Sequence, residues 1–428
     1  MKLRIESLKL HEVGPFSDTT IHFAKREDAG AEVHILTGSN GSGKSTVLAA
    51  LSLPFIPIDE AVRDMRPRMK TKLSQIEMET NWGLIGFIPD HKKVSPAHQF
   101  GASGHTVFYS TKMSDALSHY FMALQSNYVK NVPILTLAFS GHRFIGPGKL
   151  SNITEPNFAQ SLLSSASFSQ HDPELLVQWV ANTKAKAALA RADGEPATEY
   201  EAALDVVKNS LSEIIGKPVE FKIQRDPLAV QLQIGSEVVP LEGLADGLKA
   251  MIALLADVLM RLDKAPWAAD ITGPLTARPM ILLLDEIDIH LHPKWQRKIL
   301  PVLQKTFTNA QIFVSTHSPF VVGSVDDAFV YRLDPTSTNI HAVRSGAGQS
   351  YMTILASIFD VSEQFDPETE SLFAKFYAAR SRAIRGESDS EFQALAIELS
   401  QRGEEVQDIV SRELAQVKRL RANVLVAA

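Results

Sequence analysis

The sequence predicts an α/β fold, in which a mixed sheet is flanked by helices, with a short helical hairpin inserted and a helical region at the C-terminal end. Three short apolar runs predict the sheet, because each is typical of a strand buried on both faces. Each run ends in polar residues, at Gly38, Asp285 and Ser315. Since the carboxyl ends of parallel strands meet at one edge of a sheet, we expect these polar residues to lie close together.

The composition is that of a globular chain with one large domain or two to three modest ones: 428 residues, 45% hydrophobic and 21% charged. The net charge of −6 argues against a broadly basic surface for nucleic acid, although a local basic groove stays open. The absence of cysteine excludes disulfides, cysteine–zinc sites and cysteine nucleophiles. The start MKLRIESLKL lacks the apolar core of a signal peptide, and no run approaches the ~18 apolar residues of a membrane span. We therefore expect a cytoplasmic protein that does not enter a membrane.

Alternating and apolar runs predict the strands of the first third of the chain. A turn at Gly14-Pro15 separates the first two strands, and a turn at residues 140–143 follows the last. The stretch from Pro54 to Val132 carries mixed signals, and its one expected helix covers residues 114–128. The expected strands cover residues 2–10, 19–23, 33–36, 75–79, 105–109 and 133–139.

Apolar residues at helical spacing predict two helices, residues 173–192 and 198–215, joined by the breaker ADGEPA. At 1.5 Å per residue they form a hairpin of roughly 30 Å per arm, which is more often a packed surface hairpin than a functional device. Two more strands begin at Val219 and Val230. Further helices are expected over residues 244–262, 351–359, 371–384, 392–401 and 406–420. The chain thus divides into residues 1–345, with the hairpin at 173–215, and a helical region at 346–428.

The first polar segment, GSNGSGKST from Gly38 to Thr46, has the pattern G-x-x-x-x-G-K-[ST]. Glycines let backbone N–H groups converge on an anion, and the helix that follows adds its positive N-terminal end. Lys44 can then reach the terminal phosphates of a nucleotide, and the Ser45 hydroxyl can hold magnesium. An ordinary glycine–serine turn is the alternative. The expected nucleotide contacts here are Gly38, Ser39, Asn40, Gly41, Ser42, Gly43, Lys44, Ser45 and Thr46.

The second segment, ILLLDEIDIHLHP from Ile281 to Pro293, places two carboxylates at the end of a buried strand. Such groups are costly there unless a cation or a polar network receives them. We expect Asp285 to hold Mg²⁺ together with Ser45, and Glu286 to be the general base that activates the water attacking the γ-phosphate. A strand-end salt bridge is the alternative. ATP hydrolysis, with ATP and Mg²⁺ as cofactors, is the expected activity.

The third segment, QIFVSTHSP, places His317 after another apolar strand. A lone histidine is more often structural, but its position at this sheet edge favours a γ-phosphate sensor. The spacing of His290 and His292 could also suggest zinc. With no cysteine and no third ligand in the sequence, we favour no zinc site.

The order of phosphate loop, LDEIDIHLHPKWQ and STHSP resembles the ABC-type ATPase heads of SMC-like repair proteins, RecF and the OLD family, over roughly residues 1–330. It looks especially like stand-alone ATPases of bacterial antiphage defence operons, such as the Septu ATPase PtuA. The resemblance implies an ABC-type P-loop ATPase head that forms head-to-head dimers. It also makes the segment with Ala245, Asp246 and Gly247 the signature motif, which reaches the γ-phosphate of the partner copy. Residues 288–292 would form the loop that faces the opposite subunit.

The sequence departs from that family in three ways. Ala245 stands where the signature motif has serine, so a hydroxyl contact to phosphate is lost. No glutamine occupies the loop after the strand at 133–139, and His142 or Arg143 is the expected substitute as a nucleotide contact. The long coiled coil of SMC proteins is absent, and the hairpin at 173–215 looks like a shortened counterpart.

The expected partners follow from the resemblance and from what the C-terminal region lacks. No HNH, phosphodiesterase or TOPRIM nuclease pattern stands out there, so we expect a separate nuclease subunit of HNH or TOPRIM type and an assembly or docking role for residues 346–428. We also expect a homodimer or higher homo-oligomer in a bacterial antiphage complex. Three alternatives stay open: a RecF-like DNA-repair ATPase that binds DNA directly, a transporter subunit, and a module that binds ATP without turnover.

Overall fold

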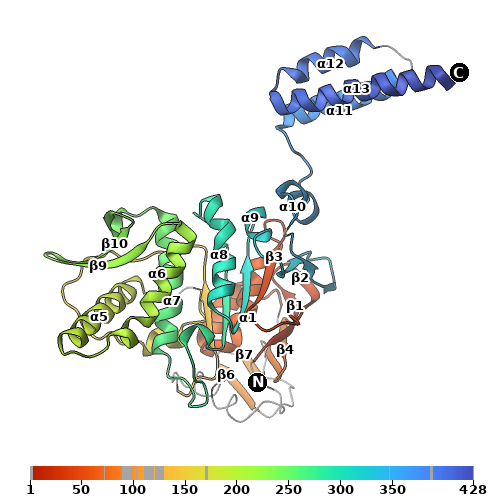
Figure 1. Ribbon diagram of the computed structural model, residues 1–428. Helices are drawn as coiled ribbons and strands as arrows, with labels where there is room; N and C mark the ends of the chain where they lie inside the picture. Colours follow the sequence, from red (N-terminus) through yellow and green to blue (C-terminus); the bar gives the residue numbers. More distant parts are fainter. Residues whose placement is uncertain are drawn as a thin grey trace. The chain divides into compact units, whose positions relative to one another are not determined.

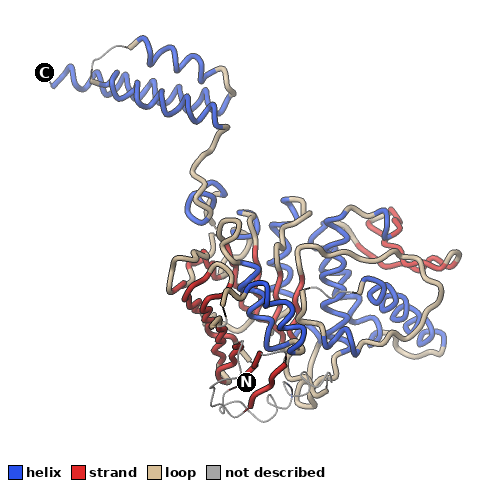
Figure 2. The backbone as a smooth tube through the Cα atoms, turned by 180° about the vertical axis from the view of Figure 1, so that it is seen from behind, coloured by secondary structure: helices blue, strands red, loops and turns tan. Residues whose placement is uncertain are grey.

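The computed structural model describes residues 3–71, 73–88, 98–102, 105–109, 120, 130–168, 172–346, 348–385 and 389–427. The chain forms two compact units, Met1–Ile354 and Leu355–Ala428. Figures 1 and 2 show the elements of both units from opposite sides. The helix expected over residues 114–128 lies outside the described residues apart from Tyr120. None of the helices in the described ranges combines the length and the apolar character needed to cross a membrane.

A six-stranded sheet lies at the centre of the first unit, and its strand order is β16-β14-β3-β13-β12-β8. All its strands run parallel except β16, which is antiparallel to β14. Leu284 at the end of β12 pairs with Phe139 on one side and Val314 on the other, so the segments that follow these strands emerge side by side. The strands are β3 (Glu32–Thr37), β8 (Leu135–Phe139), β12 (Met280–Leu284), β13 (Ala310–Ser315), β14 (Phe329–Arg332) and β16 (Val343–Arg344).

The first unit also contains a sheet of seven strands, in the order β15-β2-β1-β4-β5-β7-β6. Neighbouring strands in this sheet are antiparallel except for the β15–β2 pair. The strand expected over residues 2–10 begins later and continues to Val13, because it pairs with both β2 and β4. Its strands are β1 (Ile5–Val13), β2 (Phe16–His22), β4 (Gln75–Thr80), β5 (Gly83–Ile88), β6 (His98–Ala102), β7 (His105–Tyr109) and β15 (Asn339–Ile340).

A buried polar cluster joins the two sheets. The Gln311 side chain on β13 accepts from the Ile5 amide at 2.9 Å and donates to the Ile5 carbonyl at 3.0 Å, as a neighbouring strand would. The Arg4 guanidinium donates to Glu32 Oε2 at 2.8 Å, and the His34 ring nitrogen Nε2 lies 3.5 Å from that oxygen. The charges of the cluster are therefore paired, as burial demands.

The helical hairpin forms with the predicted bounds, as α5 (Pro173–Ala192) and α6 (Thr198–Ile215). The Asp172 carboxylate caps α5 by accepting from the amides of Glu174 and Leu175, at 3.0 and 3.2 Å. The predicted helix after it is α7 (Asp246–Lys264), which lies beside α6 (Figure 1). A three-stranded sheet covers the hairpin; its strands are β9 (Val219–Arg225), β10 (Leu228–Ile234) and β11 (Glu237–Pro240).

The remaining helices of the first unit surround the central sheet; they are α1 (Lys44–Ser52), α2 (Ile58–Met65), α4 (Ala159–Leu163), α8 (Pro293–Thr306) and α9 (Pro319–Val322). Helix α10 (Tyr351–Ile358) spans the boundary between the units. The second unit is a bundle of α11 (Pro367–Ile384), α12 (Ser390–Ser400) and α13 (Glu404–Ala427), which pack around buried residues that include Phe376, Phe392 and Val410. The predicted mixed sheet, flanking helices and helical C-terminal region are thus confirmed.

Candidate nucleotide site

The phosphate loop connects β3 to α1 at the carboxyl edge of the central sheet. Gly38, Gly41 and Gly43 have φ values of 142°, 81° and 98°, a conformation that side chains disfavour. At Gly43 a Cβ atom would also lie 2.5 Å from the Phe16 ring, so only glycine fits beneath the loop. The sequence therefore folds here into a tight turn that delivers backbone N–H groups to the start of a helix, which is the geometry of an anion site.

Lys44 links this loop to the strand ends. Its ammonium group donates to the carbonyl oxygens of Gly38 at 3.0 Å and Ser39 at 3.1 Å. Burial lowers the pKa of Lys44, and the negative charges of Asp285, Glu286 and Asp288 oppose that shift. The Lys44 ammonium group therefore lies close enough to the carboxylates that follow β12 to interact with their charges.

The Ser315 hydroxyl fixes the first of these carboxylates. It donates to Asp285 Oδ1 at 2.5 Å and accepts from the Glu286 amide at 2.8 Å. Ser315 is fully buried, so one hydroxyl satisfies a carboxylate and an amide that would otherwise be costly. Glu286 itself has a φ of 47°, in the left-handed region. The end of β13 thereby holds the turn that aims Glu286.

The next hydroxyl holds the following part of the same loop. Thr316 Oγ1 donates to Asp288 Oδ1 at 2.5 Å. The Gln296 side chain on α8 donates to the carbonyls of Asp288 and Leu291, at 3.1 and 2.9 Å, and accepts from the Ser318 hydroxyl at 2.7 Å. Residues 285–291 are therefore tied to the segment after β13 at several points.

The end of β8 closes the site from the other side. Gly141 lies directly against the catalytic candidate: a Cβ atom on it would be 2.8 Å from Glu286 Oε2. Two residues later, the Arg143 guanidinium donates to the carbonyls of Glu286 and Ile287, both at 3.3 Å. Burial lowers the pKa of Arg143 to about 10, against the opposing charges of Asp288, Asp285 and Glu286.

The residues present fit a magnesium ion. Within the described part of the chain, Asp285 Oδ2 and the Ser45 hydroxyl make no hydrogen bond, and both are half-buried. Carboxylate and hydroxyl oxygens are the protein ligands that Mg²⁺ accepts beside the oxygens of a nucleotide.

The three histidines lie in different settings. His317 follows Thr316 at the same sheet edge and is exposed. His290 is exposed and has a φ of 62°, whereas His292 Nδ1 accepts from the Lys294 amide at 3.2 Å and caps α8. Among the residues with described positions, no three metal-binding side chains gather in one place.

One of the predicted signature residues, Gly247, contacts the loop of residues 285–291 in its own chain. Ala245 is the N-cap of α7 and makes no side-chain cap, and both Ala245 and Asp246 are exposed. Gly247 packs so closely on the His290 carbonyl that a Cβ atom there would overlap that oxygen. The start of α7 is thus joined to the loop that contains Glu286.

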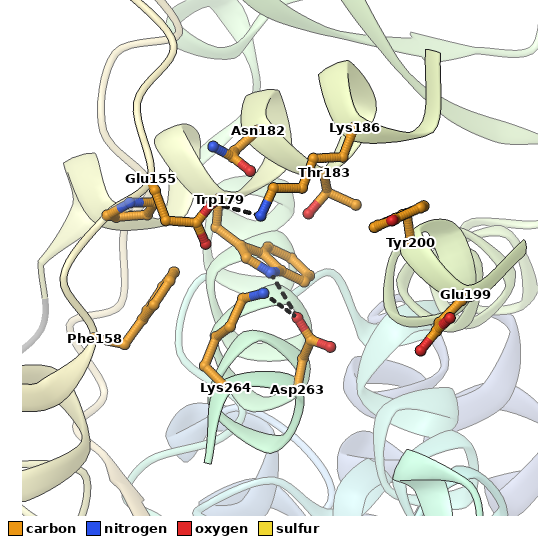
Figure 3. A pocket seen from close by; sticks show the side chains of 11 residues that line it. Glu155, Phe158, Trp179, Asn182, Thr183, Lys186, Glu199, Tyr200, Asp263 and Lys264 are labelled. Atoms are coloured by element: carbon orange, nitrogen blue, oxygen red, sulfur yellow. Dashed lines mark hydrogen bonds and ion pairs between the residues drawn. The ribbon is translucent and has the colours of Figure 1, made fainter. Parts of the chain in front are cut away.

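A separate pocket of about 220 Å³ lies between α5, the start of α6 and the end of α7, and none of its lining residues belongs to the phosphate loop or to residues 285–291 (Figure 3). Its ammonium groups are already paired: Lys186 with Glu155 at 2.5 Å, and Lys264 with Asp263 at 3.0 Å. The Asp263 carboxylate also accepts from Trp179 Nε1 at 3.3 Å. The lysines of this pocket are therefore engaged by carboxylates, whereas the phosphate loop remains the candidate anion site.

Sequence reasoning identified the phosphate loop and the carboxylate pair but missed the residues that hold them. The prediction for the segment after β13 concerns His317 alone and assigns no role to Ser315 and Thr316. The signal was available, because polar hydroxyl residues directly after a fully apolar strand need partners when they are buried. The site of Arg143 was predicted without its carbonyl acceptors, which nothing in the linear sequence indicates.

Comparison with known proteins gives two family models that match parts of the chain. The model described as "AAA domain, putative AbiEii toxin, Type IV TA system" matches residues 209–323, and one described as "AAA domain" matches residues 3–64. The first covers α7, β12 and β13, and the second covers the phosphate loop. The matched segments therefore contain all three polar strand ends.

Curated relatives include the retron Ec83 probable ATPase of Escherichia coli, 31% identical over 38% of this chain and 29% of that protein. The retron Vc95 probable ATPase of Vibrio cholerae is 32% identical over 43% of this chain and 36% of its own length. The Septu protein PtuA of Bacillus mycoides is 28% identical over 40% of this chain and 24% of its own length. The matches thus span about a quarter to a third of these relatives.

Solved structures that match the chain include an SMC head domain from Thermotoga maritima, with a TM-score of 0.40 and 14% identity over 80% of this chain and 98% of that one. The sequence comparisons confirm the predicted resemblance to antiphage proteins: the chain is similar to two retron probable ATPases and to the Septu protein PtuA, and two AAA-domain models match it.

Proposed function

We propose that the chain is a Mg²⁺-dependent, ATP-hydrolysing switch subunit of a bacterial antiphage defence complex. The observation that carries this proposal is the convergence of Lys44 with Asp285 and Glu286 at one sheet edge, because β3, β13 and β12 are parallel neighbours and these residues follow β3 and β12. A lysine on a phosphate loop, a carboxylate with a free oxygen and a second carboxylate held in a tight turn are the groups that phosphoryl transfer to water requires. The similarity to retron and Septu proteins supports the setting.

Each group has a distinct role in this proposal. The loop amides and Lys44 bind the β- and γ-phosphates, and Lys44 exchanges its bonds to the Gly38 and Ser39 carbonyls for phosphate oxygens. Asp285 and Ser45 hold the magnesium ion, which supplies charge neutralisation when it is bound. Glu286 orients a water molecule and accepts its proton, and His317 contacts the γ-phosphate from the exposed end of β13.

We further propose a head-to-head dimer, or a higher assembly built from it, in which Ala245, Asp246 and Gly247 reach the nucleotide of the partner copy. The exposed start of α7 supports this role, because its free N–H groups can bind phosphate without a serine hydroxyl. Residues 346–428 are then an assembly or docking region for a separate HNH or TOPRIM nuclease. The separately packed helical bundle is consistent with that role.

The first experiment measures ATP hydrolysis with and without Mg²⁺, together with mass by light scattering. The variants are Glu286→Gln, Lys44→Ala and, as a control, Arg225→Ala on an exposed position of β9. We expect Glu286→Gln to lose at least about 100-fold in kcat while ATP holds it in an even-numbered assembly, and Lys44→Ala to lose nucleotide affinity. Wild-type protein that binds ATP but neither hydrolyses it nor changes mass would refute the switch and leave a nucleotide-binding scaffold.

A second experiment tests the partner. Co-expression with an HNH or TOPRIM protein encoded beside this chain should give a stable complex whose nuclease activity changes with ATP. ATP-dependent binding of this chain alone to gapped or duplex DNA, with no such complex, would favour the RecF-like alternative instead.

A further inference from the structure

Arg143 is a buried arginine whose contacts are directed at the catalytic turn. Only 8% of the residue is exposed, and its Nη2 atom donates to the carbonyls of Glu286 and Ile287. These acceptors are backbone atoms of the two residues that follow Asp285. The guanidinium therefore contacts the peptide backbone that sets the direction of the Glu286 side chain.

That backbone is in a conformation that needs support. Glu286 has a φ of 47°, which a residue with a side chain adopts only where its surroundings impose it. The Ser315 hydroxyl binds the Glu286 amide on one side, and Arg143 binds the Glu286 carbonyl on the other. The peptide units before and after the Glu286 Cα atom are thus each bound by a buried side chain, one at the end of β13 and the other in the segment that follows β8.

Arg143 makes little use of its own hydrogen-bonding capacity. Its Nε and Nη1 groups are buried and have no hydrogen-bond partner among the residues that the structure describes. A cavity of about 30 Å³ adjoins the residue, and Asp172 at the start of α5 and Asp257 on α7 also line it. A buried charge with two unused donors is a poor way to stabilise a fold, so stability alone does not account for an arginine here.

From this geometry we infer that Arg143 is a positioning residue for hydrolysis: it holds Glu286 in its left-handed turn through the two carbonyls and does not bind the nucleotide. This inference rests on the proposed function of Glu286 as the general base. It replaces the sequence-based expectation that Arg143 takes the place of a nucleotide-binding glutamine. A shift of about 1 Å in a catalytic group costs on the order of 100-fold in rate. Arg143 can therefore affect the rate of hydrolysis without contacting ATP.

The test compares Arg143→Ala and Arg143→Lys with wild type and with Arg225→Ala, an arginine-to-alanine control at an exposed site. We expect kcat to fall at least about 10-fold in both Arg143 variants while KM for ATP and the affinity for a fluorescent ATP analogue change less than about 3-fold. Millimolar guanidinium chloride should restore part of the lost kcat in Arg143→Ala, and equal concentrations of sodium chloride should not. A KM or Kd raised 10-fold with kcat retained would overturn the inference and assign Arg143 to the nucleotide.

A second readout does not require hydrolysis. The Ile289 amide donates to the Glu286 carbonyl at 3.2 Å, and its hydrogen exchange reports whether the turn is held. We expect exchange at Ile289 to accelerate at least about 10-fold in Arg143→Ala and to stay at the wild-type rate in Arg225→Ala. If wild-type protein does not hydrolyse ATP, the proposed function fails while this measurement still tests the support of the turn. Unchanged exchange at Ile289 in a folded Arg143→Ala protein would overturn the inference.

Discussion

Replacing Gly141 by alanine should slow hydrolysis without unfolding the protein. A Cβ atom at this position would lie 2.8 Å from Glu286 Oε2 and 3.1 Å from Glu286 Cβ, whereas ordinary contact begins at 3.4 Å. The carboxylate must therefore move by about 0.6 Å. Because the Glu286 carboxylate is the free end of a flexible side chain, it can move at little cost in folding free energy. The Glu286 Cβ and Ile289 Cδ1 atoms, each 3.1 Å from the added Cβ atom, need to move by only about 0.3 Å.

The kinetic cost follows from the same displacement. If a 1 Å error in a catalytic group costs about 100-fold, a displacement of about 0.6 Å should lower kcat on the order of 10-fold. KM for ATP should stay within about 3-fold of wild type, because Gly141 does not belong to the phosphate loop. The melting temperature should fall by no more than about 2 °C, since less than about 1 kcal/mol of folding free energy is at stake.

Steady-state ATP hydrolysis and thermal unfolding measure these quantities. Gly243→Ala is the matched control. A Cβ atom at that position would have Val239 Cγ1 as its nearest neighbour, at 3.5 Å, which is an ordinary contact. This variant should behave like wild type. Wild-type kcat in Gly141→Ala would refute the assignment of Glu286 as the base. A loss confined to KM would place Gly141 in nucleotide binding.

Two further predictions concern buried polar contacts. Ser315→Ala removes the hydroxyl that bonds to Asp285 and to the next amide, so we expect a loss of about 2–4 kcal/mol in stability, a lower melting temperature and a lower kcat; an unchanged melting temperature would contradict the buried bonds. Burial alone would raise the pKa of Glu32, but the hydrogen bond with His34 and the charge of Arg4 hold that pKa below its usual value. Glu32 therefore stabilises the fold above about pH 4.5, and this contribution is lost as the pH falls through its lowered folded-state pKa. Glu32→Gln should reduce the difference in melting temperature between pH 7 and pH 4, and an unaltered difference would show that Glu32 is not part of the acid response.

The sequence was most informative where one local rule decides the structure. The hairpin helices have their predicted bounds, because Asp172-Pro173 begins α5 and the breaker ADGEPA ends it. The strands before the three polar segments were found for the same kind of reason, since a run that is apolar on both faces has few alternatives to a central strand. In these places local preference and tertiary packing agree.

The elements that were missed depend on pairing with distant segments. Strand β14 has only four residues, Phe329–Arg332, and exists because it adds to β3 almost 300 positions earlier in the chain. Strand β11 likewise adds to β10 as a short edge strand. Their sequences carry too few residues to establish a period, so only the partner strand identifies them.

The same distinction applies to the site. Gly38–Thr46 forms a motif because its residues act together within one turn, and the turn can be recognised from the chain alone. Ser315 and Arg143 act on residues 29 and 143 positions away. No periodicity links such positions, and only the parallel order of β8, β12 and β13 brings them to one turn.

The close packing of Gly247 on His290 has a consequence for how two copies would communicate. In the proposed dimer, the start of α7 senses the nucleotide of the partner copy, and the same helix start rests on the loop that carries Glu286 in its own chain. A displacement of α7 caused by the nucleotide in one copy would therefore shift the loop that carries Glu286 in the other copy. Two nucleotides bound in such a pair would act cooperatively. A copy with an empty site would hydrolyse no ATP itself and would also lower the rate of hydrolysis in its partner. Full activity of such a switch would require both sites to be occupied. The hydrolysis rate would therefore rise sigmoidally with the ATP concentration and not in proportion to it.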